Sequence, residues 1–259
     1  AVIDISSKEL TDDSAFAVDL SAGINATAIK NDFLRQDGSN YLGFANTNQP
    51  SQNQHNFPNS LDPKKVSFPL NHGYAISGGK MFRIGKNNNP LSFFAVASHG
   101  TSFSYTKEIV RNTTSNGTIF QDQKGDKYSQ TTNQLVLANA NYEMNHRHNI
   151  GYNFMLIHVN DQYVGEYGGL QTEAFQSSPD LSGIIRRQQT NDNLLMVNQL
   201  VSDWKLSRIT RLSIGATYNR VKGLEPDRRE NYFTHVEGAR YNLTRSNRNK
   251  RFFSDLHNN

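Results

Sequence analysis

Two groups of side chains in this sequence combine types and spacings that could support chemistry, and the first is a histidine pair. His146 and His148 flank Arg147, and each could offer an imidazole nitrogen to a metal ion. A structural metal site usually takes four protein ligands, and no second pair of ligands is evident. We therefore expect solvated side chains in a short turn and no metal site. The other histidines are scattered and suggest no cluster; they are His55, His72, His99, His158, His235 and His257.

The second group is a cluster of charged side chains beside Pro226. It consists of Glu225, Asp227, Arg228, Arg229 and Glu230. Two carboxylates can perform acid–base chemistry, so a secreted β-rich enzyme is one hypothesis. The alternating charges favour a salt-bridge network that stabilises a loop instead. The sequence also lacks a nucleophile elbow, a zincin helix and the spacing of a phosphate-binding loop. We therefore expect no catalytic residue, no cofactor and no enzymatic activity.

Composition narrows the function classes further. The chain has 259 residues, a formal net charge of +4, 36% hydrophobic residues and no cysteine. The lack of cysteine excludes disulfides, cysteine-ligated metals and thiol nucleophiles. Basic residues concentrate only over 240–251, so nucleic-acid binding is not expected. Apolar content below the usual value of about 45–50% leaves two classes: partly disordered chains, and β-barrels with one apolar face.

The spacing of apolar residues decides between these two classes. In 15–25, alternate residues such as Phe16, Val18 and Leu20 are apolar, and the residues between them are small or polar. A period of two is typical of strands. We therefore predict an all-β, antiparallel fold with about seven strands. The strong strands have about ten residues, the length that a tilted strand needs to cross a bilayer. The other predicted strands are 73–84, 91–105, 130–142, 149–158, 194–203 and 211–220.

The lengths of the connections point to a membrane barrel. Short connections follow the strands that end near residues 84, 142 and 203. The intervening connections are long: 26–72, 106–129, 159–193 and 221 to the end. Outer-membrane barrels have this asymmetry, with short periplasmic turns and long extracellular loops. The pattern favours a transmembrane β-barrel segment over a soluble β-sandwich, which stays the alternative.

Several aromatic residues could mark a membrane interface or a ligand. Tyr74, Phe82, Tyr105, Tyr142 and Tyr218 lie near predicted strand ends, where barrels carry aromatic girdles. Tyr and Phe also favour strands in any protein. A second set, Tyr41, Phe44, Tyr163 and Tyr167, falls in predicted loops and could contact a ligand that the sequence does not identify. Asp19 is expected on the inner face, as a substrate contact or an ordinary lumen-facing residue.

The strand count suggests an internal piece of a longer protein. Seven strands is an odd number, whereas single-chain bacterial barrels use even numbers. The chain starts within an alternating segment, AVIDIS, and stops in loop-like SDLHNN, with no eighth strand evident in the last thirty residues. A plugged barrel of about 22 strands would need roughly 800 residues at this density. We expect an isolated segment of this kind to form an open, curled sheet.

The opening of the chain resembles the plug-to-barrel junction of TonB-dependent outer-membrane receptors of the Bacteroidetes type. Val2, Ile3, Asp4, Ile5 and Lys8 match the plug-closing strand, and Gly23 and Asn25 match the end of the first barrel strand. Asp32–Leu34 and Tyr41–Phe44 match two elements of the following loop, although Tyr41 replaces the usual tryptophan. Gly223–Asn231 resembles the EPDRR element of the same family, and the terminal RNKRFFSDL is also similar.

The resemblance implies a division of the chain and a function. Residues 1–10 would be the last strand of the plug, and 11–259 the first part of a truncated barrel. The whole receptor would import a scarce nutrient, such as a siderophore, cobalamin, glycan or peptide, across the outer membrane. Its implied partners are outer-membrane lipid, TonB through an upstream region, the nutrient and a surface lipoprotein. The competing hypothesis is a soluble, secreted β-sandwich that binds a ligand or carbohydrate.

Overall fold

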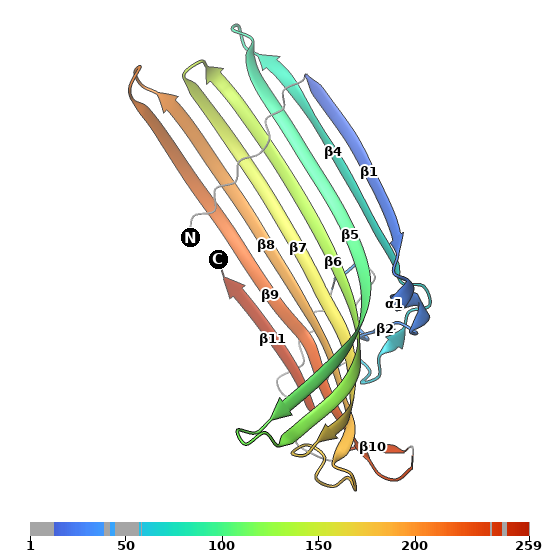
Figure 1. Cartoon of the computed structure of the whole chain (residues 1–259). Coiled ribbons are helices and arrows are strands. Elements are labelled where there is room, and N and C mark those ends of the chain that lie inside the picture. Colours follow the sequence, from blue (N-terminus) through green and yellow to red (C-terminus); the bar gives the residue numbers. More distant parts are fainter. Residues whose placement is uncertain are drawn as a thin grey trace.

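A computed structural model describes residues 13–38, 42–44, 57, 59–238, 240–244 and 248–258. The predicted plug strand, 1–10, lies outside these residues. Most of the described chain forms one nine-stranded antiparallel sheet (Figure 1). The order is β1-β4-β5-β6-β7-β8-β9-β10, with β11 also paired to β9, and the sheet is open. The predicted all-β, open curled sheet is therefore confirmed. The strands of this sheet are β1 (Ser14–Ile24), β4 (Leu70–Ile84), β5 (Asn89–Thr113), β6 (Ile119–Asn145), β7 (His148–Gln171), β8 (Ser182–Lys205), β9 (Arg211–His235), β10 (Tyr241–Leu243) and β11 (Lys250–Asn258).

Each of the seven predicted strands coincides with one strand of the structure, except that 15–25 extends one residue beyond β1, and the count was too low. The final strand, β11, pairs with β9 from Lys250 opposite Glu230 to Asn258 opposite Val221. The prediction that the last thirty residues contain no strand was therefore wrong. β11 shows little apolar alternation, so periodicity could not reveal it. Its backbone hydrogen bonds to β9 need no such pattern.

The predicted long loops 106–129 and 159–193 are also wrong, because most of their residues continue the strands. β5 and β6 are joined only by 114–118, and β7 and β8 by 172–181. These stretches are polar on both faces, so apolar alternation disappears while the backbone ladder continues. Tyr163 and Tyr167 consequently lie in β7 and not in a loop. A strand of 25 residues, such as β5, is about 80 Å long at about 3.3 Å per residue, well beyond the thickness of a bilayer.

Short turns join the strands at the opposite end of the sheet, as the sequence predicted. They span 85–88, 146–147 and 206–210, and form the upper rim in Figure 1. Gly85 begins the first turn with a φ of +73° and Asn88 ends it with a φ of +51°. Both are residue types that tolerate the left-handed region.

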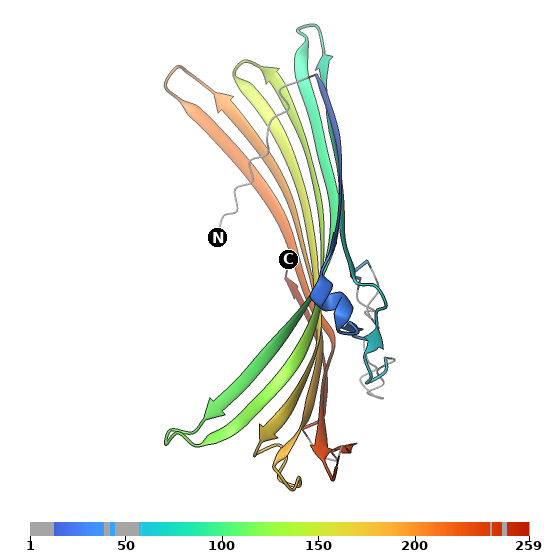
Figure 2. The same ribbon diagram turned by 45° about the vertical axis from the view of Figure 1, so that its right-hand side comes forward.

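The described residues between β1 and β4 pack on one face of the sheet, and we call these described residues of 25–69 the docked segment. It contains α1 (Ala26–Lys30) and a small sheet of β2 (Leu34–Arg35) and β3 (Lys64–Lys65). The side chain of Asn25 caps α1 by accepting from the amides of Thr27 and Ala28. Figure 2 shows this segment, in blue and teal, beside the lower half of the sheet. No helix among the described residues is long and apolar enough to cross a membrane.

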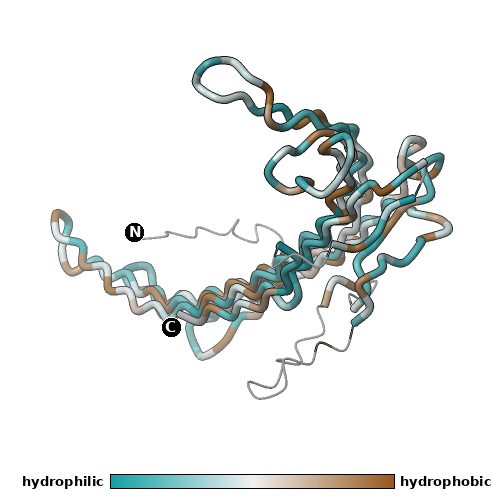
Figure 3. Tube along the Cα trace, turned by 90° about the horizontal axis from the view of Figure 1, so that it is seen from below, coloured by the Kyte–Doolittle hydropathy of each residue, from teal (hydrophilic) through white to brown (hydrophobic). Residues whose placement is uncertain are grey.

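The docked segment and the sheet share a small hydrophobic core. Ala28 and Phe33 pack against Phe103 of β5, Tyr128 of β6 and Val164 of β7. The Phe33 ring meets the rings of Phe103 and Tyr128 edge-on, at centroid distances of 5.2 and 5.6 Å. Viewed roughly along its strands in Figure 3, the sheet is an arc, and the docked segment lies on its outer side.

Candidate functional site: an apolar band bounded by a polar belt

The outer face of the sheet carries exposed apolar side chains over the half that leads to the short turns. The register aligns them, since Leu20 pairs with Tyr74, Val18 with Ile76 and Tyr152 with Leu200. We call this surface the apolar band. Its large exposed members are Phe16, Val18, Leu20 and Ile24 of β1, Tyr74, Ile76, Phe82 and Ile84 of β4, Phe93 of β5, Val136 of β6, Tyr152 of β7, Leu200 of β8, and Leu212, Ile214 and Tyr218 of β9.

The band extends across seven strands and is strongly exposed. Leu20 is 81% exposed and Ile214 is 56% exposed. Phe16 to Ile24 covers about 26 Å of strand at about 3.3 Å per residue, or about 20 Å along an axis to which the strand is tilted by about 40°. Soluble monomers rarely expose an apolar surface of this extent, so the band is a candidate contact surface.

The inner face carries small and polar residues on β1, whereas on β5 to β8 it also carries an apolar row, Val96, Leu137, Met155 and Val197. On β1 the small and polar residues include Ala17, Asp19 and Ser21, and Asp19 lies opposite Ala75 of β4. Asp19 is therefore on the inner face, as predicted. The two faces of β1 thus differ sharply in polarity, which is the alternation that the sequence displays there.

A row of polar side chains ends the apolar band on its outer face. His99, Gln134 and His158 lie opposite one another on β5, β6 and β7. The amide nitrogen of Gln134 donates to Nδ1 of His99 at 3.1 Å, and its oxygen accepts from Nδ1 of His158 at 3.0 Å. Nε2 of His158 lies 2.8 Å from Oδ1 of Asp192 on β8. His72 of β4 completes the row, with its ring centroid 5.6 Å from that of His99. We call these five residues the polar belt.

The expectation that the histidines form no cluster was therefore wrong for three of them. His72, His99 and His158 are far apart in sequence, and the strand register brings them into one row. His158 is 3% exposed, and the Phe44 ring stacks on it at a centroid distance of 4.9 Å. Among the described residues, no group of three or more His, Asp or Glu side chains could hold a metal ion. The belt is therefore a hydrogen-bonded network and not a ligand cage.

The docked segment covers part of the belt through a tight backbone approach. The carbonyl oxygen of Leu42 accepts a hydrogen bond from Gln134. Gly43 has a φ of +79°, and a Cβ atom there would lie 2.7 Å from Cβ of Thr132. Only glycine satisfies both conditions without strain. The side chains just beyond the belt, including Thr132 and Asn160, are fully buried.

A second contact holds the docked segment through the charged cluster of β9. Asp227 accepts from Arg229 and Arg251, with separations of 2.6 and 2.7 Å. The side chain of Arg229 is completely buried and also donates to the carbonyl oxygens of Ser60 and Asp37. The predicted salt-bridge network is therefore present, but it lies within a strand and ties a distant segment to it.

The electrostatics of this network fix Asp227 as a carboxylate. Burial by itself would raise the pKa of Asp227, but hydrogen bonds from Arg251, Arg229 and Asn59 together lower the pKa below its ordinary value. The two other carboxylates of the cluster, Glu225 and Glu230, form separate ion pairs at 3.5 Å with Arg228 and at 2.9 Å with Arg187. The acidic residues thus neutralise neighbouring arginines.

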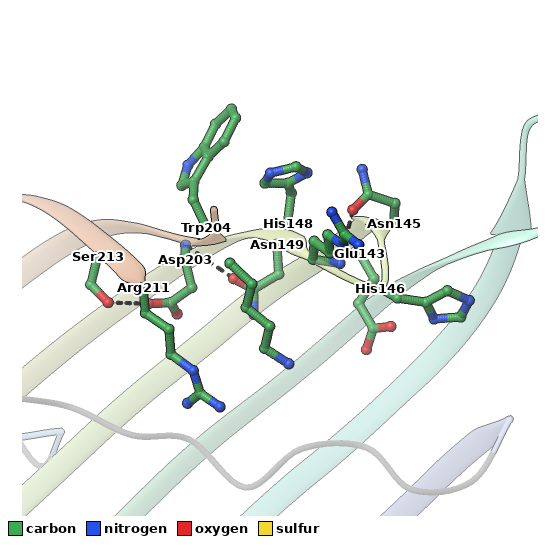
Figure 4. Close-up of a pocket in the computed structure, with 11 residues that line it drawn as sticks. Glu143, Asn145, His146, His148, Asn149, Asp203, Trp204, Arg211 and Ser213 are labelled. Carbon is green, nitrogen blue, oxygen red and sulfur yellow. Dashed lines mark hydrogen bonds between the residues drawn. The ribbon is translucent and has the colours of Figure 1, made fainter. Parts of the chain in front are cut away.

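The histidines of the second short turn lie at a polar pocket on the rim. Glu143, Asn145, Asp203 and Arg211 are among its lining residues (Figure 4). His146 and His148 point in different directions in this view, and His148 lies beside Trp204, 4.5 Å between ring centroids. The two imidazoles therefore do not converge on a common position.

No protein-family model matches the chain, and no curated protein or solved structure matches it either.

The predicted aromatic sets divide differently from the expectation. Tyr105 lies well inside β5, and its hydroxyl donates to Asp126 at 2.5 Å, which is the main cause that raises its pKa to about 12. Tyr163 donates to Gln189 on the neighbouring strand β8, and Tyr167 donates to Glu108 on β5, two strands away. Tyr41 lies outside the described residues. Tyr74, Phe82 and Tyr218 belong to the apolar band, in agreement with a position on the outer face.

The remaining histidines occupy unrelated positions. His235 ends β9, where Nδ1 lies 3.2 Å from Asp180 and Nε2 meets the carbonyl of Gly238. The strand residue His257 lies opposite Lys222. His55 lies outside the described residues. A sequence signal for the belt did exist: His99 and His158 sit at the next alternate position after Ala97 and Leu156, where each apolar run gives way to polar residues.

Proposed function

We propose that this chain forms part of the wall of a TonB-dependent transporter in the outer membrane of a Gram-negative bacterium. The apolar band is the main support for this proposal. Its exposed apolar face of about 20–26 Å matches the lipid-facing apolar surface of a membrane barrel, which is about 25 Å tall. The inner face would line the lumen, and the short turns would lie on the periplasmic side. The resemblance of the opening residues and of Gly223–Asn231 to that family supports the more specific assignment.

The strand extensions and the polar belt fit the same orientation. The belt would mark the outer boundary of the hydrocarbon region, where polar side chains replace apolar ones on the lipid-facing surface. Beyond it, β5 to β9 would continue as a raised wall outside the cell, with the docked segment packed against it. Two cations on the band face, Lys80 and Arg220, have long stems that can carry their charge toward an interface. The Lys80 ammonium lies 5.3 Å from the centre of the Phe82 ring.

In this proposal the chain contributes to import and not to catalysis. Its partners would be outer-membrane lipid along the band, TonB through a plug domain, the imported nutrient and a surface lipoprotein. The alternative of a soluble β-sandwich needs a second sheet over the band. Among the described residues, only the docked segment packs on that face, and its core contacts lie beyond the belt.

Cysteine labelling in outer membranes tests which face of the sheet contacts lipid. The chain contains no native cysteine, so the label attaches only to the introduced one. Tyr218 lies on the band and Thr217, its neighbour on β9, lies on the inner face, and both are exposed. We expect a fluorophore on Tyr218→Cys to be quenched by brominated lipids, and one on Thr217→Cys to resist that quenching. Equal quenching of the two, or recovery of the protein outside the outer membrane, would refute the membrane assignment. Nutrient uptake that persists in cells without TonB would refute the proposal that TonB supplies the energy for transport.

A further inference from the structure

A cavity on the inner face of the strand extensions has no part in the function proposed above. It has a volume of about 560 Å³ and opens between β8, β9 and β11. Arg187, Arg228, Lys250 and Phe252 contribute to its lining. Their neighbours Gln188 and Arg229 point to the opposite face, toward the docked segment. The cavity shares only Arg251 with the Asp227 network, because Arg251 also lines it. Its volume is typical of a small-molecule site.

The cavity carries an excess of positive charge. Four basic residues, Arg187, Arg228, Lys250 and Arg251, line it together with one acidic residue, Glu230. Two further carboxylates lie outside the lining: Glu225 pairs with Arg228, and Asp227 pairs with Arg251. The Arg187 and Arg228 side chains are 47% and 40% exposed. Each guanidinium has five N–H donors, and one carboxylate partner leaves several of them available.

The arginines are held in position before any ligand arrives. Arg187 donates to Glu230 at 2.9 Å, and the Arg228 guanidinium lies 4.5 Å from the centre of the Phe252 ring. Gln189 is fixed by Tyr163, whose hydroxyl donates to it at 3.0 Å. A fixed guanidinium matches the planar, two-pronged geometry of an oxyanion, and little ordering remains to oppose binding.

We propose that this cavity binds a small organic anion through a carboxylate or phosphate group, which is held between Arg187 and Arg228. Lys250 adds attraction from the β11 side, and Phe252 offers an apolar surface to the remainder of the ligand. The inference rests on the proposed function only in naming this anion as cargo, because the inner face would then line the transport path. The binding site itself follows from the cavity and its charges.

Isothermal titration of the detergent-purified protein with citrate and with inorganic phosphate tests the site. We expect at least one of the two anions to bind, and Arg187→Gln and Arg228→Gln each to weaken binding about tenfold or more. Arg228→Lys keeps the positive charge but loses the two-pronged guanidinium, so it should weaken binding less than Arg228→Gln does. Lys107→Gln removes one positive charge from the exposed outer face of β5 and should leave the affinity unchanged.

The inference is wrong if neither anion binds to the wild-type protein, or if Lys107→Gln weakens binding as much as the two arginine variants do. Hydrogen exchange of β8 and β9 in each variant separates lost binding from lost structure. Binding by a protein that is absent from the outer membrane would refute the proposed function and leave the site intact. An outer-membrane protein that imports its nutrient but binds neither anion would refute the site alone.

Discussion

Replacing Asp227 by asparagine removes the charge that two arginines share at the contact between β9 and the docked segment. The Arg229 side chain is completely buried, and that of Arg251 is 20% exposed. Asparagine has nearly the same shape, so the substitution changes the charge and one hydrogen-bonding group with little change in volume. The buried guanidinium of Arg229 then has no counter-charge.

The expected cost follows from that burial. Breaking a buried ion pair by removing one partner costs about 3–5 kcal/mol, because the remaining charge stays desolvated. Arg229 also donates to the backbone of Ser60 and Asp37, so the segment can relieve the charge only by moving away. We therefore expect the loss to appear in the docking of residues 36–38 and 59–61, while the backbone ladder of the sheet persists.

Hydrogen exchange followed by mass spectrometry measures this local opening. A change of 3–5 kcal/mol corresponds to an increase in exchange of about 10²- to 10³-fold or more for these amides. The matched control is Asp122→Asn, which breaks an exposed pair with Arg111 at 2.9 Å. An exposed pair contributes about 0–1 kcal/mol, so the control should change exchange by no more than about fivefold. Equal, small effects of both substitutions would refute the role given to the Asp227 network.

Three further outcomes follow from the docked segment and its contacts. Gly43→Ala should expose residues 42–44 to proteolysis, because it adds backbone strain of about 1–2 kcal/mol and a collision with Thr132. Gly85→Ala is the control: it adds similar strain in open space and should leave the cleavage of residues 42–44 unchanged. Phe33→Ala should destabilise the segment by about 3–5 kcal/mol through loss of a buried ring, measured by hydrogen exchange; a loss below 1 kcal/mol would contradict the packing. The pKa of Asp227 is lowered on folding. Its contribution to the stability of docking is therefore complete at a pH above the ordinary pKa of 3.8 and is lost as the pH falls through the lowered pKa. Docking measured by tryptic cleavage after brief exposure to each pH should therefore be constant from pH 5 to 8 and weaken below about pH 4.

The part of the fold with two chemically different faces could be predicted from the sequence. In β1, apolar residues such as Phe16 and Leu20 alternate with Ala17 and Asp19, so one strand in isolation reveals its period. The short turns were predictable for a similar reason, because Gly85 and the asparagines that follow it break the alternation. Local sequence is enough to predict a strand where the strand itself determines whether each residue faces an apolar or a polar environment.

The strand extensions could not be predicted in this way. Residues such as Lys124, Asp126 and Gln162 lie on the extended parts of β6 and β7, where polar residues occur on both faces, so no period appears. Backbone hydrogen bonds between β6 and β7 continue there regardless of side-chain polarity. The sequence therefore shows where apolar contrast ends, and the hydrogen-bonded ladder extends well beyond that point.

The polar belt and the Asp227 network depend on relations between distant residues. Gln134 meets both His99 and His158 only because three strands share one register, which no single strand specifies. Arg229 acts on Ser60, 169 positions earlier in the chain, so its anchoring role is invisible locally. The charged cluster was recognised as a network, but the segment that it holds was not.

The sheet order also implies a sequence of folding events. From β4 to β9 every strand pairs with its neighbour in the chain across a connection of ten residues or fewer, whereas β1 and β4 are separated by residues 25–69, which include the docked segment. Closing that longer connection costs about 2 kcal/mol more in chain entropy than closing a four-residue turn. The anchors of the segment lie on β5 to β9, so they exist only after those strands have paired. The hairpins from β4 to β9 should therefore form first, the docked segment should settle on them next, and β1 should add to β4 last, although it is the first strand of the sheet along the chain.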